Sequence, residues 1–112
     1  MTFYRERVAN VEIVTLVGNS LDVTNSSEFK GDIQPVIEDN PFVILDMNNV
    51  KFVDSSGCGA ILSCLRKARE AKGDVKICNT AEQIIELFRL IRLDRIIEIH
   101  TSQQKAVDSF SN

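Results

Sequence analysis

The pattern of apolar and polar residues opens with two runs that predict neighbouring strands. Residues 3–7 and 11–17 are the two runs, and the second is rich in β-branched side chains. Ala9 and Asn10 between them suit a turn. We therefore expect an antiparallel pair at the start of the chain.

Three later apolar runs predict further strands. Residues 42–47 alternate little between apolar and polar, which is typical of a strand covered on both faces. Residues 75–78 and 96–99 form shorter runs, and we expect them to extend the same sheet.

The clearest amphipathic helix follows residue 54. Apolar residues from Ile61 to Ala68 recur at spacings of three and four, while basic residues between 66 and 72 fall mainly on the other side. Gly73 then supplies a residue that readily takes the left-handed conformation at which many helices end.

Two more helices are predicted from capping signals. Asn25 with Glu28, and Thr80 with Gln83, have the three-residue spacing of a capping box. The first of these helices contains Pro35, which removes a backbone donor and clashes with the preceding turn. We expect a kink or a break at that residue.

This order of elements predicts one α/β domain over residues 1–112. With a last, polar helix from Ser102 to Phe110, the chain has about four helices and four to five strands. Their alternation favours a mixed, mostly parallel β-sheet with one antiparallel element at its start. A chain of 112 residues is long enough to bury its core without disulfides.

Composition and charge argue against several classes of function. A net charge of −3 gives no reason to expect direct binding to nucleic acid. No apolar run approaches the roughly 20 residues of a membrane helix, and the N-terminus lacks the apolar core of a signal peptide. Cys58, Cys64 and Cys78 lack the spacing of a disulfide framework or a zinc site. We expect a cytoplasmic protein with reduced cysteines and no cofactor or metal.

The candidate site is the segment Asp54 to Ala60, with the sequence DSSGCGA. It joins a short apolar run to the amphipathic helix, so a carboxylate and two hydroxyls lie at the positive end of that helix. Taken alone, Ser-Ser-Gly is also what helix capping would produce, because serine oxygens accept the first free N–H groups. Asp22, Asp46 and His100 have equally ordinary structural interpretations.

The residues give little support for catalysis at this segment. A hydrolase elbow has the pattern Gly-x-Ser-x-Gly, but no glycine lies two positions before Ser55 or Ser56, and His100 is the only histidine. A phosphoacceptor aspartate would need clustered carboxylates to hold Mg²⁺, and no acidic pair ends the first or second strand beside Asp46 and Asp54. We expect no enzyme activity.

A docking surface controlled by phosphorylation needs neither a pocket nor a base. A phosphoryl group on Ser55 would add about −1.5 to −2 charges, which a helix N-terminus tolerates. The negative charge of Asp54 would repel the phosphoryl group. Because the helix N-terminus tolerates the added charge, we expect the surface potential to change much more than the fold. A further hypothesis is redox sensing by an exposed Cys58, with a thiol pKa lowered by the helix N-terminus.

The segment 54–62, with the run 43–50 before it, resembles the STAS domain of bacterial anti-sigma factor antagonists. The resemblance extends to Leu21-Asp22 before the first helix, and to residues 84–88 and 93–97. It covers nearly the whole chain, and the order of elements around the Asp-Ser-Ser-Gly sequence makes it fairly specific.

The resemblance implies a regulatory protein rather than an enzyme. Such a domain binds an anti-sigma factor that is also a serine kinase, and a sigma factor is thereby released. The kinase, which holds the nucleotide, phosphorylates the serine after the motif aspartate, here Ser55, and a PP2C-type phosphatase removes the phosphate. The implied partner surface consists of Asp22, Thr24, Asp54, Ser56, Gly57 and Cys58. The family usually has a bulky apolar residue at position 58, so we expect the contact there to differ.

A second hypothesis keeps the fold and changes the partner. The chain would then be a STAS subunit of a transporter ATPase or of another signalling assembly, and its partner would be associated with a membrane. Ser55 would serve only as a helix cap. For the chain itself we expect no membrane segment, and a monomer or a weak dimer.

Overall fold

Helices and strands alternate along residues 1–111, the part of the chain that the computed structural model describes. In chain order the elements are β1 (Phe3–Val8), β2 (Val11–Leu16), β3 (Ser20–Leu21), α1 (Ser26–Asp39), β4 (Phe42–Asp46), β5 (Phe52–Val53), α2 (Ser55–Glu70), β6 (Asp74–Cys78), α3 (Glu82–Leu90), a 3-10 turn (Leu93–Arg95), β7 (Ile99–His100) and α4 (Gln103–Ser109). This order confirms the predicted α/β class and the antiparallel pair at the start of the chain.

The main sheet has the strand order β1-β2-β4-β6-β7. Only β1 and β2 pair antiparallel, and the other neighbours pair parallel. The register places Val43 between Glu12 of β2 and Val75 of β6. β4 has a neighbouring strand on each side and helices on both faces. Both faces of the strand are therefore buried, which explains why its apolar run does not alternate with polar residues. The predicted mixed, mostly parallel sheet is confirmed.

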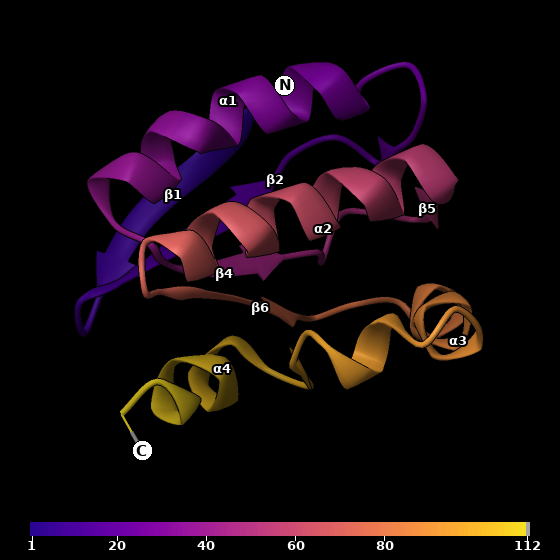
Figure 1. Cartoon of the computed structure of the whole chain (residues 1–112). Coiled ribbons are helices and arrows are strands. Elements are labelled where there is room, and N and C mark those ends of the chain that lie inside the picture. Colours follow the sequence, from indigo (N-terminus) through magenta and orange to yellow (C-terminus); the bar gives the residue numbers. More distant parts are fainter. Residues whose placement is uncertain (112) are drawn as a thin grey trace.

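Helices cover the two faces of this sheet unequally (Figure 1). α1 and α2 lie side by side on one face, and the short α4 packs on the other face against β4, β6 and β7. Successive side chains of a strand point to opposite faces. Accordingly, Leu45 belongs to the larger core with α1 and α2, whereas its neighbour Ile44 packs with Ala106 and Val107 of α4.

A second, two-stranded sheet positions the candidate site. β3 and β5 pair parallel over two residues each, with Ser20 opposite Phe52 and Leu21 opposite Val53. This pairing was not predicted from the sequence. It brings the loop after β3 to the segment that begins α2, although the two are about thirty residues apart in the sequence.

The strand expected at residues 96–99 is wrong in its bounds. Leu93 and Ile97 are both buried in the larger core, and the chain between them forms a 3-10 turn followed by a bend. The chain therefore reaches the edge of the sheet later, and only Ile99 and His100 pair with β6.

Both predicted capping boxes are wrong. Asn25 precedes α1, but its side chain accepts a hydrogen bond from the Asp22 N–H and donates one to the Ser20 carbonyl. Glu28 instead pairs with the N-terminal ammonium group of Met1. At α3, the residue before the helix is Ala81, which has no side chain to cap it.

The predicted break in α1 is also wrong. The helix runs through Pro35 to Asp39. Pro35 lies on the exposed face, and so does Gly31, whose carbonyl would accept the missing hydrogen bond. Water can bond that carbonyl, which explains why the helix continues.

Candidate functional site

Asp54 links two segments of backbone at the N-terminus of α2. Its Oδ1 accepts a hydrogen bond from the Gly57 N–H at 2.9 Å, and its Oδ2 accepts one from the Val23 N–H at 3.0 Å. The Asp54 N–H donates to the Leu21 carbonyl at 3.3 Å. One carboxylate thus caps α2 and fastens the loop after β3 to it. Ser55 and Ser56 are not needed as caps, which corrects the purely structural interpretation of this sequence.

A second carboxylate lies in the loop that Asp54 fastens. Asp22 Oδ1 accepts hydrogen bonds from the Thr24 hydroxyl and from the Thr24 N–H, the latter at 2.9 Å. These two hydrogen bonds, the hydroxyl's first, hold the pKa of Asp22 below its ordinary value. Two of the predicted site residues, Asp22 and Thr24, therefore share one loop, and Val23 between them is exposed.

The two predicted hydroxyls differ in exposure. Ser55 is exposed and Ser56 is half-buried, both in the first turn of α2. The first turn of α2 contains no acidic residue, so the positive end of the helix dipole is offset only by Asp54 before it. Of the two serines, Ser55 is the one whose hydroxyl an enzyme can reach more easily.

Gly57 lies beneath this surface. A Cβ built on it would lie 2.1 Å from the Leu21 carbonyl oxygen and 2.9 Å from a methyl group of Val53. Only glycine allows α2 to approach β3 so closely. The structure therefore places Gly57 as packing between α2 and β3, and not as an exposed contact.

Cys58 was expected to be exposed with a lowered thiol pKa, and both expectations are wrong. The residue is only 4% exposed, because it faces the core side of α2. Burial, and then the charge of Asp54, raise the pKa of its thiol. The basis for redox sensing at this position is therefore lost.

An apolar groove lies beside Ser55. Its volume is about 600 Å³, and it is lined by Phe52, Val53, Asp54, Ser55, Cys58, Gly59, Leu62, Leu87 and Ile91. Phe52 and Ile91 are 55% and 48% exposed, and they contribute to an exposed apolar patch, which is more informative than a single exposed apolar side chain. The groove was not predicted from the sequence, because apolar residues such as Phe52 and Ile91 are ordinarily assigned to the core.

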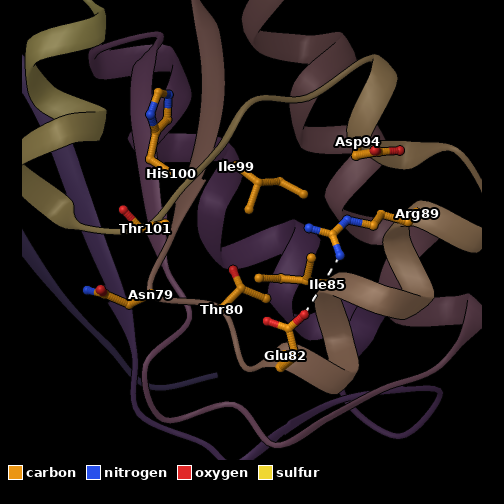
Figure 2. A pocket seen from close by; sticks show the side chains of 9 residues that line it. All are labelled: Asn79, Thr80, Glu82, Ile85, Arg89, Asp94, Ile99, His100 and Thr101. Carbon is orange, nitrogen blue, oxygen red and sulfur yellow. Dashed lines mark ion pairs between the residues drawn. The ribbon is translucent and has the colours of Figure 1, made fainter.

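A second cleft lies at the carboxyl ends of β6 and β7 (Figure 2). Its volume is about 450 Å³, and its lining comprises Asn79, Thr80, Glu82, Ile85, Arg89, Asp94, Ile99, His100 and Thr101. Figure 2 shows the Arg89 guanidinium beside the Glu82 carboxylate, at an N–O distance of 3.7 Å. The lining contains two carboxylates, Glu82 and Asp94, and one guanidinium, Arg89, so the charge of the cleft does not favour an anion.

Two side chains of this cleft, His100 and Thr80, could take part in proton transfer or hydrogen bonding. His100 Nε2 lies 3.0 Å from Glu98 Oε1, and His100 does not line the groove beside Ser55. Thr80 Oγ1 is buried and finds no hydrogen-bond partner within residues 1–111. The structure therefore does not bring the single histidine to Ser55 as a general base.

The described residues contain neither a membrane-spanning helix nor a metal-binding cluster. In the part of the chain that is described, no helix is both long enough and apolar enough to cross a membrane. Over the same residues, no group of three or more His, Cys, Asp or Glu side chains could hold a metal ion.

Fold and site together define a small α/β domain with a mixed sheet, helices on both faces, and an exposed serine at a helix N-terminus. The chain belongs to the STAS domain family, whose model matches residues 5–106. The anti-sigma-B factor antagonist of Bacillus subtilis is 23% identical to it over 96 residues, which cover 86% of this chain and 88% of that protein.

Three solved structures show the same fold. The anti-sigma factor antagonist SpoIIAA in its unphosphorylated form has a TM-score of 0.72 at 20% identity, covering 99% of both chains. In its phosphorylated form, described for Bacillus, it has a TM-score of 0.70 at 22% identity, covering 97% of this chain and 99% of that one. The murine anion transporter Slc26a9 has a TM-score of 0.81 at 22% identity, covering 96% of this chain but only 19% of the transporter.

Proposed function

We propose that this protein is a cytoplasmic anti-sigma factor antagonist without enzyme activity of its own. Unphosphorylated, it binds an anti-sigma factor that is also a serine kinase, and a sigma factor is released. Phosphorylation of Ser55 ends the complex, and a PP2C-type phosphatase restores it. The protein needs no cofactor, because the nucleotide is held by the kinase, and it acts as a monomer or weak dimer.

One observation carries the proposal: Ser55 is exposed at the N-terminus of α2, while Asp54 performs the capping. A hydroxyl with no role in capping can be modified without loss of the helix. A dianion at this position also lies at the positive end of the helix dipole. The fold therefore tolerates both states of Ser55.

The proposed phosphorylation is a direct phosphoryl transfer. Ser55 Oγ attacks the γ-phosphorus of ATP in the kinase, and the Oγ–phosphorus bond forms as the bond to the β–γ bridging oxygen breaks. The hydroxyl proton passes to a base of the kinase, and ADP leaves. The phosphatase reverses the modification by hydrolysis, with water supplying the oxygen of the released phosphate.

Charge explains how the modification ends the complex. Phosphorylation adds about −1.5 to −2 charges to a surface that already carries Asp22 and Asp54. The partner surface that we propose consists of Asp22, Thr24, Asp54, Ser55 and Ser56 on the outside, with Cys58 at the edge of the apolar groove and Gly57 below. A partner fitted to the neutral hydroxyl would meet a new, desolvated charge, which costs several kcal/mol.

A capture experiment tests this function. Wild-type, Ser55→Ala and Ser55→Asp proteins serve as baits in a lysate of the source organism, and captured proteins are identified by mass spectrometry. We expect the wild-type and Ser55→Ala baits to retain the same small serine kinase, and Ser55→Asp to retain less of it. The purified kinase should then phosphorylate the wild type with ATP but not Ser55→Ala.

A second function is favoured by the likeness to the transporter Slc26a9. The chain would then be a STAS subunit of a transporter ATPase or of another signalling assembly. All three baits would capture the same transporter component in equal amounts. That outcome would overturn the switch at Ser55.

A further inference from the structure

Gly59 has a property that the fold does not explain. It lies inside α2, where glycine is less favourable than alanine, and its φ is not in the left-handed region. It is exposed, and a Cβ built on it would meet nothing within 4 Å. The neighbouring Gly57 differs, because there a Cβ would strike the Leu21 carbonyl. Nothing in residues 1–111 therefore requires glycine at position 59.

The position of Gly59 relative to Ser55 suggests that a binding partner, and not the fold, requires glycine at position 59. The two residues are four apart on one helix, so they lie on the same face, with Cβ positions about 5–6 Å apart. Helical side chains lean toward the N-terminus of their helix. Any side chain at position 59 would therefore extend over the turn that carries Ser55. Both residues also line the apolar groove.

We propose that Gly59 keeps the approach to Ser55 open, so that the kinase can lie against the bare backbone of α2 while its ATP reaches the hydroxyl. This inference rests on the proposed function and names a residue that determines access to the same site. Phosphoryl transfer requires the attacking oxygen and the phosphorus to be aligned closely, and small displacements slow such reactions strongly. A side chain between them would hold the two proteins apart.

The chain offers a matched control for this proposal. Gly31 also lies inside a helix, is exposed, and has nothing within 4 Å of a Cβ built on it. It belongs to α1 and does not line the groove. Gln is a suitable replacement at both positions, because it is long, uncharged and favourable in helices. The thermal midpoints of Gly59→Gln and Gly31→Gln should both equal or exceed that of the wild type.

The first readout is the rate at which the cognate kinase, with ATP and Mg²⁺, phosphorylates each variant. We expect Gly59→Gln to be slower by about tenfold or more, and Gly31→Gln to match the wild type. Equal rates for Gly59→Gln and the wild type would overturn the inference while leaving the switch intact. A wild type that the kinase neither binds nor phosphorylates would instead overturn the proposed function.

The second readout does not depend on the kinase. Ser55→Cys places a thiol at the site, and its rate of labelling by a bulky maleimide is measured with Gly or Gln at position 59. The native cysteines are buried, and burial raises the pKa of both Cys64 and Cys78 to about 12, so they contribute little. We expect Gly59→Gln to slow labelling and Gly31→Gln to leave it unchanged. Unchanged labelling in Gly59→Gln would show that residue 59 does not cover Ser55.

Discussion

The N-terminal ends of α2 and α3 lie on two different cavities of the protein. At α2, Asp54 accepts hydrogen bonds from both Gly57 and Val23, and the hydroxyl of Ser55 is left exposed. At α3, the residue before the helix has no capping side chain, and Thr80 Oγ1 is buried without a partner among residues 1–111. A hydroxyl at a helix end is thus available for modification where a different side chain supplies the cap and the hydroxyl itself is exposed.

The largest effect should come from the packing that holds the α2 end in place. Gly57→Ala puts a Cβ where the Leu21 carbonyl oxygen lies 2.1 Å away, so α2 must move from β3. We expect a loss of about 1–3 kcal/mol in the free energy of unfolding, measured by urea denaturation. Unchanged stability would mean that α2 does not approach β3 this closely.

The cap itself should have the next largest effect. Asp54→Ala removes the acceptor of two backbone N–H groups, from Gly57 and Val23. We expect a loss of about 1–2 kcal/mol in the free energy of unfolding. Ser55→Ala is the matched control and should leave stability nearly unchanged. If Ser55→Ala were the more destabilising of the two, the serine would be the cap after all.

The α3 end should respond in the opposite direction. Thr80→Val replaces a buried, unpaired hydroxyl with a methyl group of similar size. Because an unpaired buried hydroxyl is itself unfavourable, we expect an unchanged free energy of unfolding or a gain of up to about 1 kcal/mol. A clear loss of stability in the same urea experiment would show that this hydroxyl is bonded and that the two helix ends are more alike than the structure indicates.

The smallest effect concerns the charge of the loop beside Ser55. Thr24 donates its hydroxyl and its N–H to Asp22, which keeps the pKa of that carboxyl below the ordinary 3.8. A lowered pKa means that the carboxylate stays ionised to a lower pH in the folded protein, and that any stability it gives is lost as the pH falls through the folded value. Thr24→Val should raise the pKa of Asp22 toward 3.8, measured by ¹³C NMR titration. An unchanged titration would assign the shift to other donors.

Local pattern was sufficient for most of the fold. The apolar run of β4 and the helical spacing of α2 each specify an element by themselves, and the antiparallel start needed only a turn between two short runs, the second of them β-branched. The β3–β5 pair was not predictable, because two residues in each strand carry no periodicity and their pairing depends on a partner about thirty residues away. The capping boxes failed for a related reason: Asn25 bonds the loop before it, and the start of α3 lies one residue later than Thr80 requires.

The candidate site was predictable in its chemistry and only in part in its geometry. The sequence places Asp54 and Ser55 at a helix start, and the structure adds which of them is the cap. Whether Cys58 faces water or the core depends on the rotation of α2 against the sheet, which the sequence pattern left open. The exposure of Phe52 and Ile91 was missed, because an apolar side chain is ordinarily assigned to the core.

The most direct test of the switch at Ser55 compares the affinity of the cognate kinase for the two states of the protein. Unphosphorylated protein and protein phosphorylated at Ser55 alone, verified by peptide mapping, are titrated with the kinase by calorimetry. We predict that phosphorylation weakens binding by about tenfold or more, equivalent to about 1.4 kcal/mol or more. Equal affinities for the two states, or a phosphate found on Ser56 instead, would contradict the account.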